Sequence, residues 1–259
     1  MKADMLLPAV TAIALGAVVA FTLGPGRRVS VDTPPPAASS AANTAESASS
    51  EQRKPELFPP QDLGLLEAPD RDEWNNPDLI MDLLGIADGA VVADLGAGGG
   101  WLEIRLARRV GPNGLVYAED IQPQMIEAIS RRMLHEGLSN VRTVMGTPTD
   151  PHLPAGMDAV LIVNAYREMD DPSRPEIIET LLRNVARALK SQGRLGVADF
   201  LPGDGGPGPA AADRVSPERV IAAAEAAGFT LQSRETIPPF EFLLVFVKRP
   251  AADGTRTRP

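Results

Sequence analysis

The chain has 259 residues, of which 44% are hydrophobic and 23% are charged, and its formal net charge at pH 7 is −9. This length and composition allow one globular domain with a real core plus additional segments. The negative charge weighs against nucleic acid as the main partner, because an acidic chain repels phosphates. The absence of cysteine and the presence of only two histidines exclude disulfides, thiolate metal sites and histidine-rich metal sites.

The N-terminal segment, residues 1–28, contains an uncharged stretch from Met5 to Gly24 that is long enough to span a bilayer as a helix. Two interpretations stay open, an uncleaved membrane anchor and a cleaved signal peptide. The length of the stretch and the lack of a clear small-residue cleavage site favour the anchor. Arg27 and Arg28 favour a cytoplasm-facing domain by the positive-inside rule, whereas a cleaved signal peptide would mean export.

The segment at residues 29–60 is rich in proline, alanine and serine and has no apolar periodicity. Such a composition cannot bury enough surface to offset its ordering entropy, so it predicts a disordered linker. Residues 61–250 alternate apolar runs with amphipathic stretches, as a folded domain does. Residues 251–259 predict a disordered tail.

Strands and helices alternate along the domain. Prolines mark the predicted helix starts at Pro77, Pro123, Pro175 and Pro217, and a further helix begins at Trp101 or Leu102. The predicted helix that begins at Pro217 ends at Gly228. The predicted helix that begins at Pro175 extends to Lys190 and stops near Gly193. The predicted strands are Ala90–Leu95, Leu115–Ala118, Val141–Met145, Asp158–Val163, Arg194–Phe200, Thr230–Ile237 and Glu241–Val247.

This order of elements predicts the α/β class. Alternating strands and helices form βαβ units, which give a doubly wound, mainly parallel sheet, here with seven strands. No helix separates the last two strands, which are joined at Pro238-Pro239. These two strands therefore predict a C-terminal antiparallel hairpin.

The most informative stretch is VVADLGAGGGW, from Val91 to Trp101. A buried strand leads into a turn of small residues, and in such sheets ligands bind beyond the carboxyl ends of the strands. Glycines there let the backbone approach a ligand, although a tight turn without a ligand is the alternative. The dinucleotide fingerprint G-x-G-x-x-G does not fit, because Trp101 or Glu103 occupies its sixth position.

An acid stands at the tip of the second predicted strand. Asp120 follows the glycines by about 20 residues, and a carboxylate at this point can accept both hydroxyls of a ribose. The alternative role is an acid at a helix N-terminus, before Pro123, and the two roles are compatible. Glu119 points to the other face if the strand continues, so Asp120 is the favoured ribose ligand.

These motifs resemble a known family. ADLGAGGGW is similar to motif I of the class I S-adenosylmethionine-dependent methyltransferases, and AEDIQPQMI is similar to their strand-two motif. The resemblance extends from about Trp74 to Arg249. It implies a Rossmann-like methyltransferase fold, S-adenosylmethionine as cofactor and direct methyl transfer. The acceptor is not identified, and a small molecule is favoured.

The resemblance also implies roles for single residues. Asp94 would hold the methionine end of the cofactor, Asp120 the ribose, and Ile121 would pack on the adenine. The implied cofactor-binding residues are Asp94, Gly96, Ala97, Gly98, Asp120, Ile121, Thr147 and Asn164.

The sequence after the third predicted strand differs from the pattern of the family that it resembles. In many relatives a Gly-Asp pair at this position contacts the adenine amino group. Here Gly146 is followed by Thr147, and the nearest acid is Asp150. Thr147 or Asp150 is therefore the candidate substitute.

The loop after the fourth strand supplies the acceptor-side candidates. Methyl transfer is a direct displacement in which the protein mainly aligns its reactants, so no conspicuous catalytic triad is expected. The loop resembles a Tyr-His-Glu segment of close relatives, with Arg167 in place of the histidine. Tyr166 and Glu168 are the candidates for lining the catalytic site. The alternative for Glu168 is a solvated acidic loop that caps the next helix.

Two other classes of function stay open at this point. A methyltransferase-like domain without catalysis would serve as a binding module, an alternative that gains weight if the N-terminus is a cleaved signal peptide. A nicotinamide-dependent oxidoreductase would share the fold, but the sequence lacks its fingerprint.

Overall fold

The computed structural model describes residues 57–203 and 205–250. The predicted membrane segment, most of the predicted linker and the predicted tail lie outside these residues. Among the helices that the structure describes, none is both long and apolar enough to cross a bilayer.

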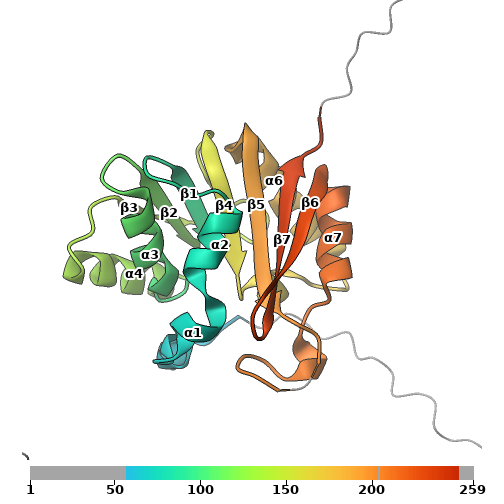
Figure 1. Cartoon of the computed structure of the whole chain (residues 1–259), viewed down its shortest axis with the longest axis horizontal. Helices are drawn as coiled ribbons and strands as arrows, with labels where there is room; N and C mark the ends of the chain where they lie inside the picture. The colour runs from blue at the N-terminus through green and yellow to red at the C-terminus, as the bar shows by residue number, and fades with distance from the viewer. Residues whose placement is uncertain (1–56, 204, 251–259) are drawn as a thin grey trace, which may run out of the picture. The chain divides into compact units, whose positions relative to one another are not determined.

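Seven strands form one sheet in the order β3-β2-β1-β4-β5-β7-β6 (Figure 1). Strands β1 to β5 pair in parallel, and β7 runs antiparallel to both β5 and β6. This arrangement confirms the predicted doubly wound sheet and its C-terminal hairpin. The strands are β1 (Val91–Leu95), β2 (Leu115–Asp120), β3 (Val141–Met145), β4 (Met157–Val163), β5 (Leu189–Phe200), β6 (Phe229–Ile237) and β7 (Glu241–Lys248).

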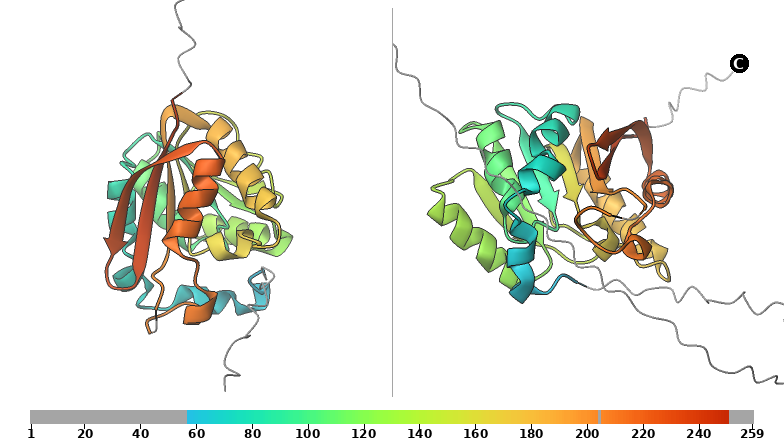
Figure 2. Two further views of the ribbon diagram at one scale, coloured as in Figure 1. Left: turned by 90° about the vertical axis from the view of Figure 1, so that its right-hand side faces the viewer. Right: turned by 60° about the horizontal axis from the view of Figure 1, so that its bottom comes forward.

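Helices cover both faces of this sheet (Figures 1 and 2). Apolar side chains of α2, α3 and α4 form cores on one face, and those of α6 and α7 form the core on the other. The described helices are α1 (Arg71–Asn75), α2 (Pro77–Leu83), α3 (Trp101–Val110), α4 (Pro123–His135), α5 (Tyr166–Met169), α6 (Pro175–Ala188) and α7 (Pro217–Ala226), with short 3₁₀ helices at Pro60–Glu67 and Ala211–Asp213.

Successive side chains along the strands point alternately into the cores on the two faces of the sheet. In β7, Phe242 and Phe246 pack on the α6 and α7 side, whereas Leu243 and Val245 pack on the α2 and α3 side. Strand β4 is almost wholly apolar for the same reason, because both of its faces are covered. The continuous apolar runs in the sequence therefore correspond to central strands.

Strand β5 starts earlier than the sequence predicts. The helix from Pro175 was predicted to extend to Lys190, but α6 ends at Ala188, and Leu189 already has extended backbone angles. The pairing of β4 with β5 shifts register after Met157, and this irregularity accommodates the extra residues of β5. Gly193 thus lies inside a strand and does not mark the end of a helix.

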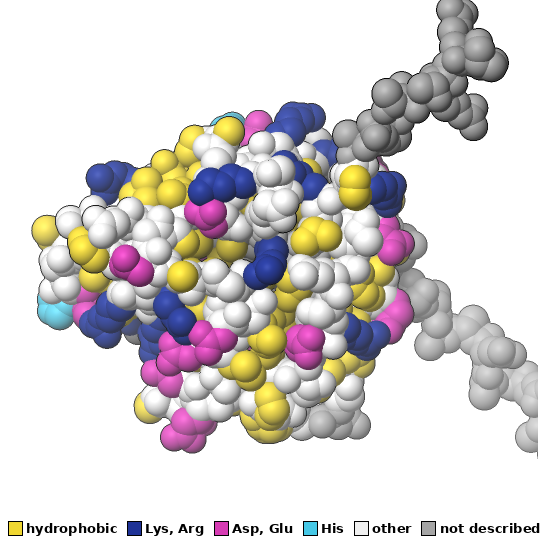
Figure 3. Space-filling view, turned by 45° about the horizontal axis from the view of Figure 1, so that its top comes forward, with side chains coloured by type: hydrophobic (Ala, Val, Ile, Leu, Met, Phe, Trp, Pro, Cys, Tyr) yellow, Lys and Arg dark blue, Asp and Glu magenta, His cyan; other side chains and the backbone are white. Residues whose placement is uncertain are grey.

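The carboxyl ends of the parallel strands form the lower edge of the sheet in Figure 1. The two views of Figure 2 show the first described segment and α1 running along this edge. At the opposite edge, seen from above in Figure 3, basic and acidic side chains are interspersed. The lower edge is where a doubly wound sheet binds its ligands.

Candidate functional site

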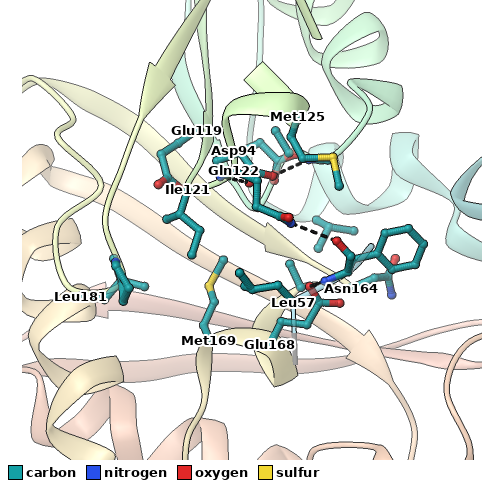
Figure 4. Close-up of a pocket in the computed structure, with 18 of the residues that line it drawn as sticks. Leu57, Asp94, Glu119, Ile121, Gln122, Met125, Asn164, Glu168, Met169 and Leu181 are labelled. Atoms are coloured by element: carbon teal, nitrogen blue, oxygen red, sulfur yellow. Dashed lines mark hydrogen bonds between the residues drawn. The ribbon is translucent and has the colours of Figure 1, made fainter. Parts of the chain in front are cut away.

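A cavity of about 270 Å³ opens at the carboxyl ends of β1, β2 and β4 (Figure 4). Its walls come from the loops that follow these strands, from α6 and from the segment before α1. The structure brings together all the residues that the sequence assigns to the cofactor, namely Asp94, Gly96, Ala97, Gly98, Asp120, Ile121, Thr147 and Asn164.

The glycine loop after β1 has a backbone that other residues rarely adopt. Gly96, Gly98 and Gly100 have φ angles of +74°, +57° and +81°. A β-carbon on Gly96 would also stand 2.7 Å from the β-carbon of Ala165, so a side chain has no room there. The glycines therefore let this loop lie directly against the loop that follows β4.

Asp120 ties β2 to the glycine loop. Its Oδ2 accepts a hydrogen bond from the Gly98 N–H at 3.0 Å, and its Oδ1 accepts one from the Gln122 N–H at 2.9 Å. Burial raises the pKa of Asp120, and these backbone donors partly oppose that rise. Because a carboxylate has about four acceptor positions, Asp120 keeps accepting capacity for a ligand beside its backbone donors.

Glu119 also lines the cavity, which the sequence prediction did not anticipate. Its side chain lies on the opposite face of β2 from Asp120, as strand alternation requires, but the cavity reaches both faces where the strand ends. Glu119 is 2% exposed, and its Oε1 has no hydrogen-bond partner within the described part of the protein. Burial, with the nearby charge of Asp120, raises the pKa of Glu119 to about 8.

One end of the cavity holds charges of both signs. Asp94 and Glu103 are buried close together, and burial raises the pKa of both carboxyls. Arg71, the first residue of α1, lies 4.0 Å from the ring centre of Trp101, and its charge favours ionisation of both acids. Because Arg71 and Asp94 both line the cavity, this end can contact a group that carries both charges.

The two acceptor-side candidates, Glu168 and Tyr166, differ in whether their side chains reach the cavity. Glu168 lines the cavity, and its Oε2 accepts a hydrogen bond from the Phe58 N–H at 3.2 Å. Burial raises the pKa of Glu168. Tyr166 does not reach the cavity, because α5 turns its ring into the core beneath, where it is 0% exposed. The structure thus brings Glu168, but not Tyr166, to the site.

Leu57 and Phe58 line the cavity although they fall inside the predicted linker. The Phe58 carbonyl accepts a hydrogen bond from Gln122 Nε2 at 3.1 Å, while its N–H donates to Glu168. Figure 4 shows Leu57 beside Glu168. Two adjacent large apolar residues in a polar, proline-rich stretch are the sequence signal that could have identified this segment.

Asn164 connects the cavity to a buried polar network. Its Nδ2 donates to Glu241 Oε1 at 2.7 Å, and its Oδ1 accepts from Asn75 Nδ2 at 2.9 Å. Burial raises the pKa of Glu241 to about 7. The network joins α1, β7 and the loop after β4, and so fixes the wall of the cavity from three segments.

Comparisons with known proteins agree with this arrangement. Residues 92–193 match a family model described as a methyltransferase domain. The chain is 31% identical over 123 residues to nocamycin O-methyltransferase of Saccharothrix syringae, a match that covers 48% of this chain and 42% of that protein. It is 30% identical over 122 residues to the ubiquinone/menaquinone biosynthesis C-methyltransferase UbiE of Hahella chejuensis, covering 46% of this chain and 47% of that one.

Solved structures share the fold. A SAM-dependent methyltransferase from Aquifex aeolicus superposes with a TM-score of 0.68 at 24% identity, over 74% of this chain and 99% of that one. The chain spans less than half the length of the two curated relatives named above. The region that matches the methyltransferase-domain model, residues 92–193, contains the glycine loop, Asp120 and Asn164, and its fold is shared with the SAM-dependent methyltransferase from Aquifex aeolicus.

Proposed function

We propose that this protein is an S-adenosylmethionine-dependent methyltransferase that transfers a methyl group directly to a small-molecule acceptor. The observation that carries the proposal is Asp120, whose buried carboxylate faces the cavity beside the glycine loop with accepting capacity left for a ribose. Nicotinamide cofactors are the weaker alternative, because the loop lacks their fingerprint.

The residues that line the cavity suit the successive parts of such a cofactor. The charged end, with Arg71 and Asp94, suits the carboxylate and ammonium of the methionine part. Asp94 Oδ1 is buried without a hydrogen-bond partner among the described residues, so an ammonium would satisfy it. Asp120 would hold the ribose, and Ile121 lies further along the wall, where the adenine would pack.

The protein's part in the reaction is to bind, align and accept a proton. The cofactor supplies an electrophilic methyl group when it is bound. Glu168 stands at the cavity, and burial raises its pKa, so its carboxylate is a suitable base for an acceptor hydroxyl or amine. Leu57 and Phe58 would exclude water from the same side. Tyr166 would act only by supporting α5 from beneath.

A small-molecule acceptor is the favoured class for two reasons. The cavity is lined by residues of the chain itself, and its volume of about 270 Å³ lies just below the range of roughly 300–1,000 Å³ that is typical of small-molecule sites. The named relatives include an O-methyltransferase for nocamycin and a C-methyltransferase of ubiquinone and menaquinone biosynthesis.

Calorimetric titration of the full-length chain with S-adenosylhomocysteine, the demethylated product, tests the proposal. We expect one site with a dissociation constant in the micromolar range and no heat from NADH under the same conditions. A folded chain that binds NADH and not S-adenosylhomocysteine would make the proposal wrong. Binding without any methyl transfer across a broad acceptor panel would favour the binding-module alternative.

We also propose that residues 1–28 anchor the protein in a membrane with the domain on the cytoplasmic side. The support is the uncharged stretch from Met5 to Gly24 and the two arginines that follow it. We expect the full-length chain to stay in the membrane pellet after carbonate extraction, and a variant without residues 1–28 to be released. A mature N-terminus located after the apolar stretch would show a cleaved signal peptide instead.

A further inference from the structure

We propose that Glu119 recognises the adenine of the cofactor through the amino edge of the base, in place of the acid that is absent after β3. This inference rests on the proposed function. It assigns a specificity-determining role to a residue at the end of β2 that the sequence motifs leave without one.

The carboxyl of Glu119 lies against the loop that follows β3. A β-carbon added to Gly146 would stand 1.7 Å from Glu119 Oε1 and 2.7 Å from its Cδ, so any other residue at position 146 would displace this carboxyl from its place. Because Oε1 is buried without a partner among the described residues, a ligand donor would satisfy it. The glycine and the glutamate together place one polar group at this wall of the cavity.

The two residues that could have replaced the missing acid are engaged elsewhere. The hydroxyl of Thr147 accepts from the Asp150 N–H at 3.0 Å and lies 3.2 Å from the Asp150 carbonyl oxygen, to which it can donate. Asp150 Oδ1 accepts from the His152 N–H at 2.9 Å, and Asp150 is not part of the cavity wall. Both side chains are thus committed to the local turn, which leaves Glu119 as the available polar group.

The surroundings of Glu119 suit a flat base. Ile121 lies two residues further along the chain on the same side of the cavity, and Leu181 of α6 lies below it (Figure 4). Pro148 adds a further apolar surface. A purine can pack its faces on these side chains and turn one polar edge to the carboxyl.

The hydrogen-bonding groups of a protonated carboxyl match those at the amino edge of adenine. Adenine offers an amino donor next to a ring-nitrogen acceptor, and a neutral carboxyl carries one acceptor and one donor side by side. The pKa of Glu119 is raised to about 8 by burial and by the charge of Asp120, the next residue of the same strand. The carboxyl of Asp94 on β1 is also close enough to interact electrostatically with Glu119. Below pH 8 Glu119 therefore holds the proton that this pairing requires.

The test compares two ligands on the full-length chain, S-adenosylhomocysteine and its analogue with purine in place of adenine, which lacks the amino group. We expect the wild type to bind the first about tenfold more tightly, the effect of one or two buried hydrogen bonds. Glu119→Leu should bind both ligands equally. Glu119→Gln, which keeps one donor and one acceptor, should retain the preference and keep it above pH 8, where the wild type loses it.

Two further variants separate the possible outcomes. Thr147→Val tests the rival residue and should keep the tenfold preference, whatever its overall affinity. Glu127→Leu removes an exposed glutamate of α4 and should match the wild type. The inference is wrong if Glu119→Leu still prefers the amino ligand or if Thr147→Val loses that preference. If the wild type binds neither ligand, the proposed function itself fails.

Discussion

Replacing Asp120 with alanine is expected to weaken S-adenosylhomocysteine binding by about 100-fold or more. Two charge-assisted hydrogen bonds from ribose hydroxyls would be lost, each contributing about 1.5–3 kcal/mol. The Gly98 and Gln122 N–H groups would also lose their acceptor, so the glycine loop would no longer be held for the ligand. Titration calorimetry measures the change directly, and near-ultraviolet circular dichroism shows whether the fold persists.

The controls for this substitution lie within the same chain. Asp120→Asn keeps one oxygen acceptor and should fall between the wild type and alanine, at about a tenfold loss. Asp78→Ala removes an exposed aspartate of α2 and should change nothing. Retention of wild-type affinity by a folded Asp120→Ala protein would contradict the assignment of the ribose site.

Much of the fold could be predicted because local signals agree with the global arrangement. Prolines begin α2, α4, α6 and α7, and the apolar run of β4 can be stable only with both faces covered. The prediction is wrong at α6 and β5, because Gly193 lies inside β5 and does not end the helix. Local propensity could not show that pairing with β4 extends the strand back to Leu189.

The candidate site was predictable where the chain itself brings residues together. The glycine loop and Asp120 follow adjacent parallel strands, so their ends must meet at one edge of the sheet. Phe58 and Arg71 arrive from the segment before the sheet, and no periodicity in the sequence indicates where that segment lies. Glu119 was set aside because alternation places it opposite Asp120, whereas the cavity at the strand end reaches both faces.

The charged end of the cavity provides a second large effect, on stability. Arg71→Met keeps an apolar chain to pack on Trp101 but removes the positive charge beside Asp94, Glu103 and Glu241. Breaking a buried charge arrangement in this way costs on the order of 3 kcal/mol, because the remaining carboxyls stay desolvated. For a domain of this size we expect the melting temperature to fall by roughly 10 °C.

The stability lost in Arg71→Met should depend on pH in one direction, which general damage to packing would not produce. Burial raises the pKa of Asp94 and Glu103 in the folded state above their values in the unfolded chain. At any pH between the unfolded-state and folded-state pKa values, the folded protein therefore binds more protons than the unfolded chain. Stability contributed by these groups therefore falls as pH rises. Loss of Arg71 raises both pKa values further, so Arg71→Met should regain part of its lost stability on acidification from pH 8 to pH 5.

A double variant tests whether the effect passes through the buried acids. Glu103→Gln removes one of the two carboxyls that repel each other, so Arg71→Met should cost clearly less in that background than in the wild type. Urea denaturation of the four proteins gives the coupling free energy. Equal costs in both backgrounds, together with no recovery at pH 5, would mean that Arg71 stabilises α1 through its cation–π contact with Trp101 and not through its effect on the buried acids.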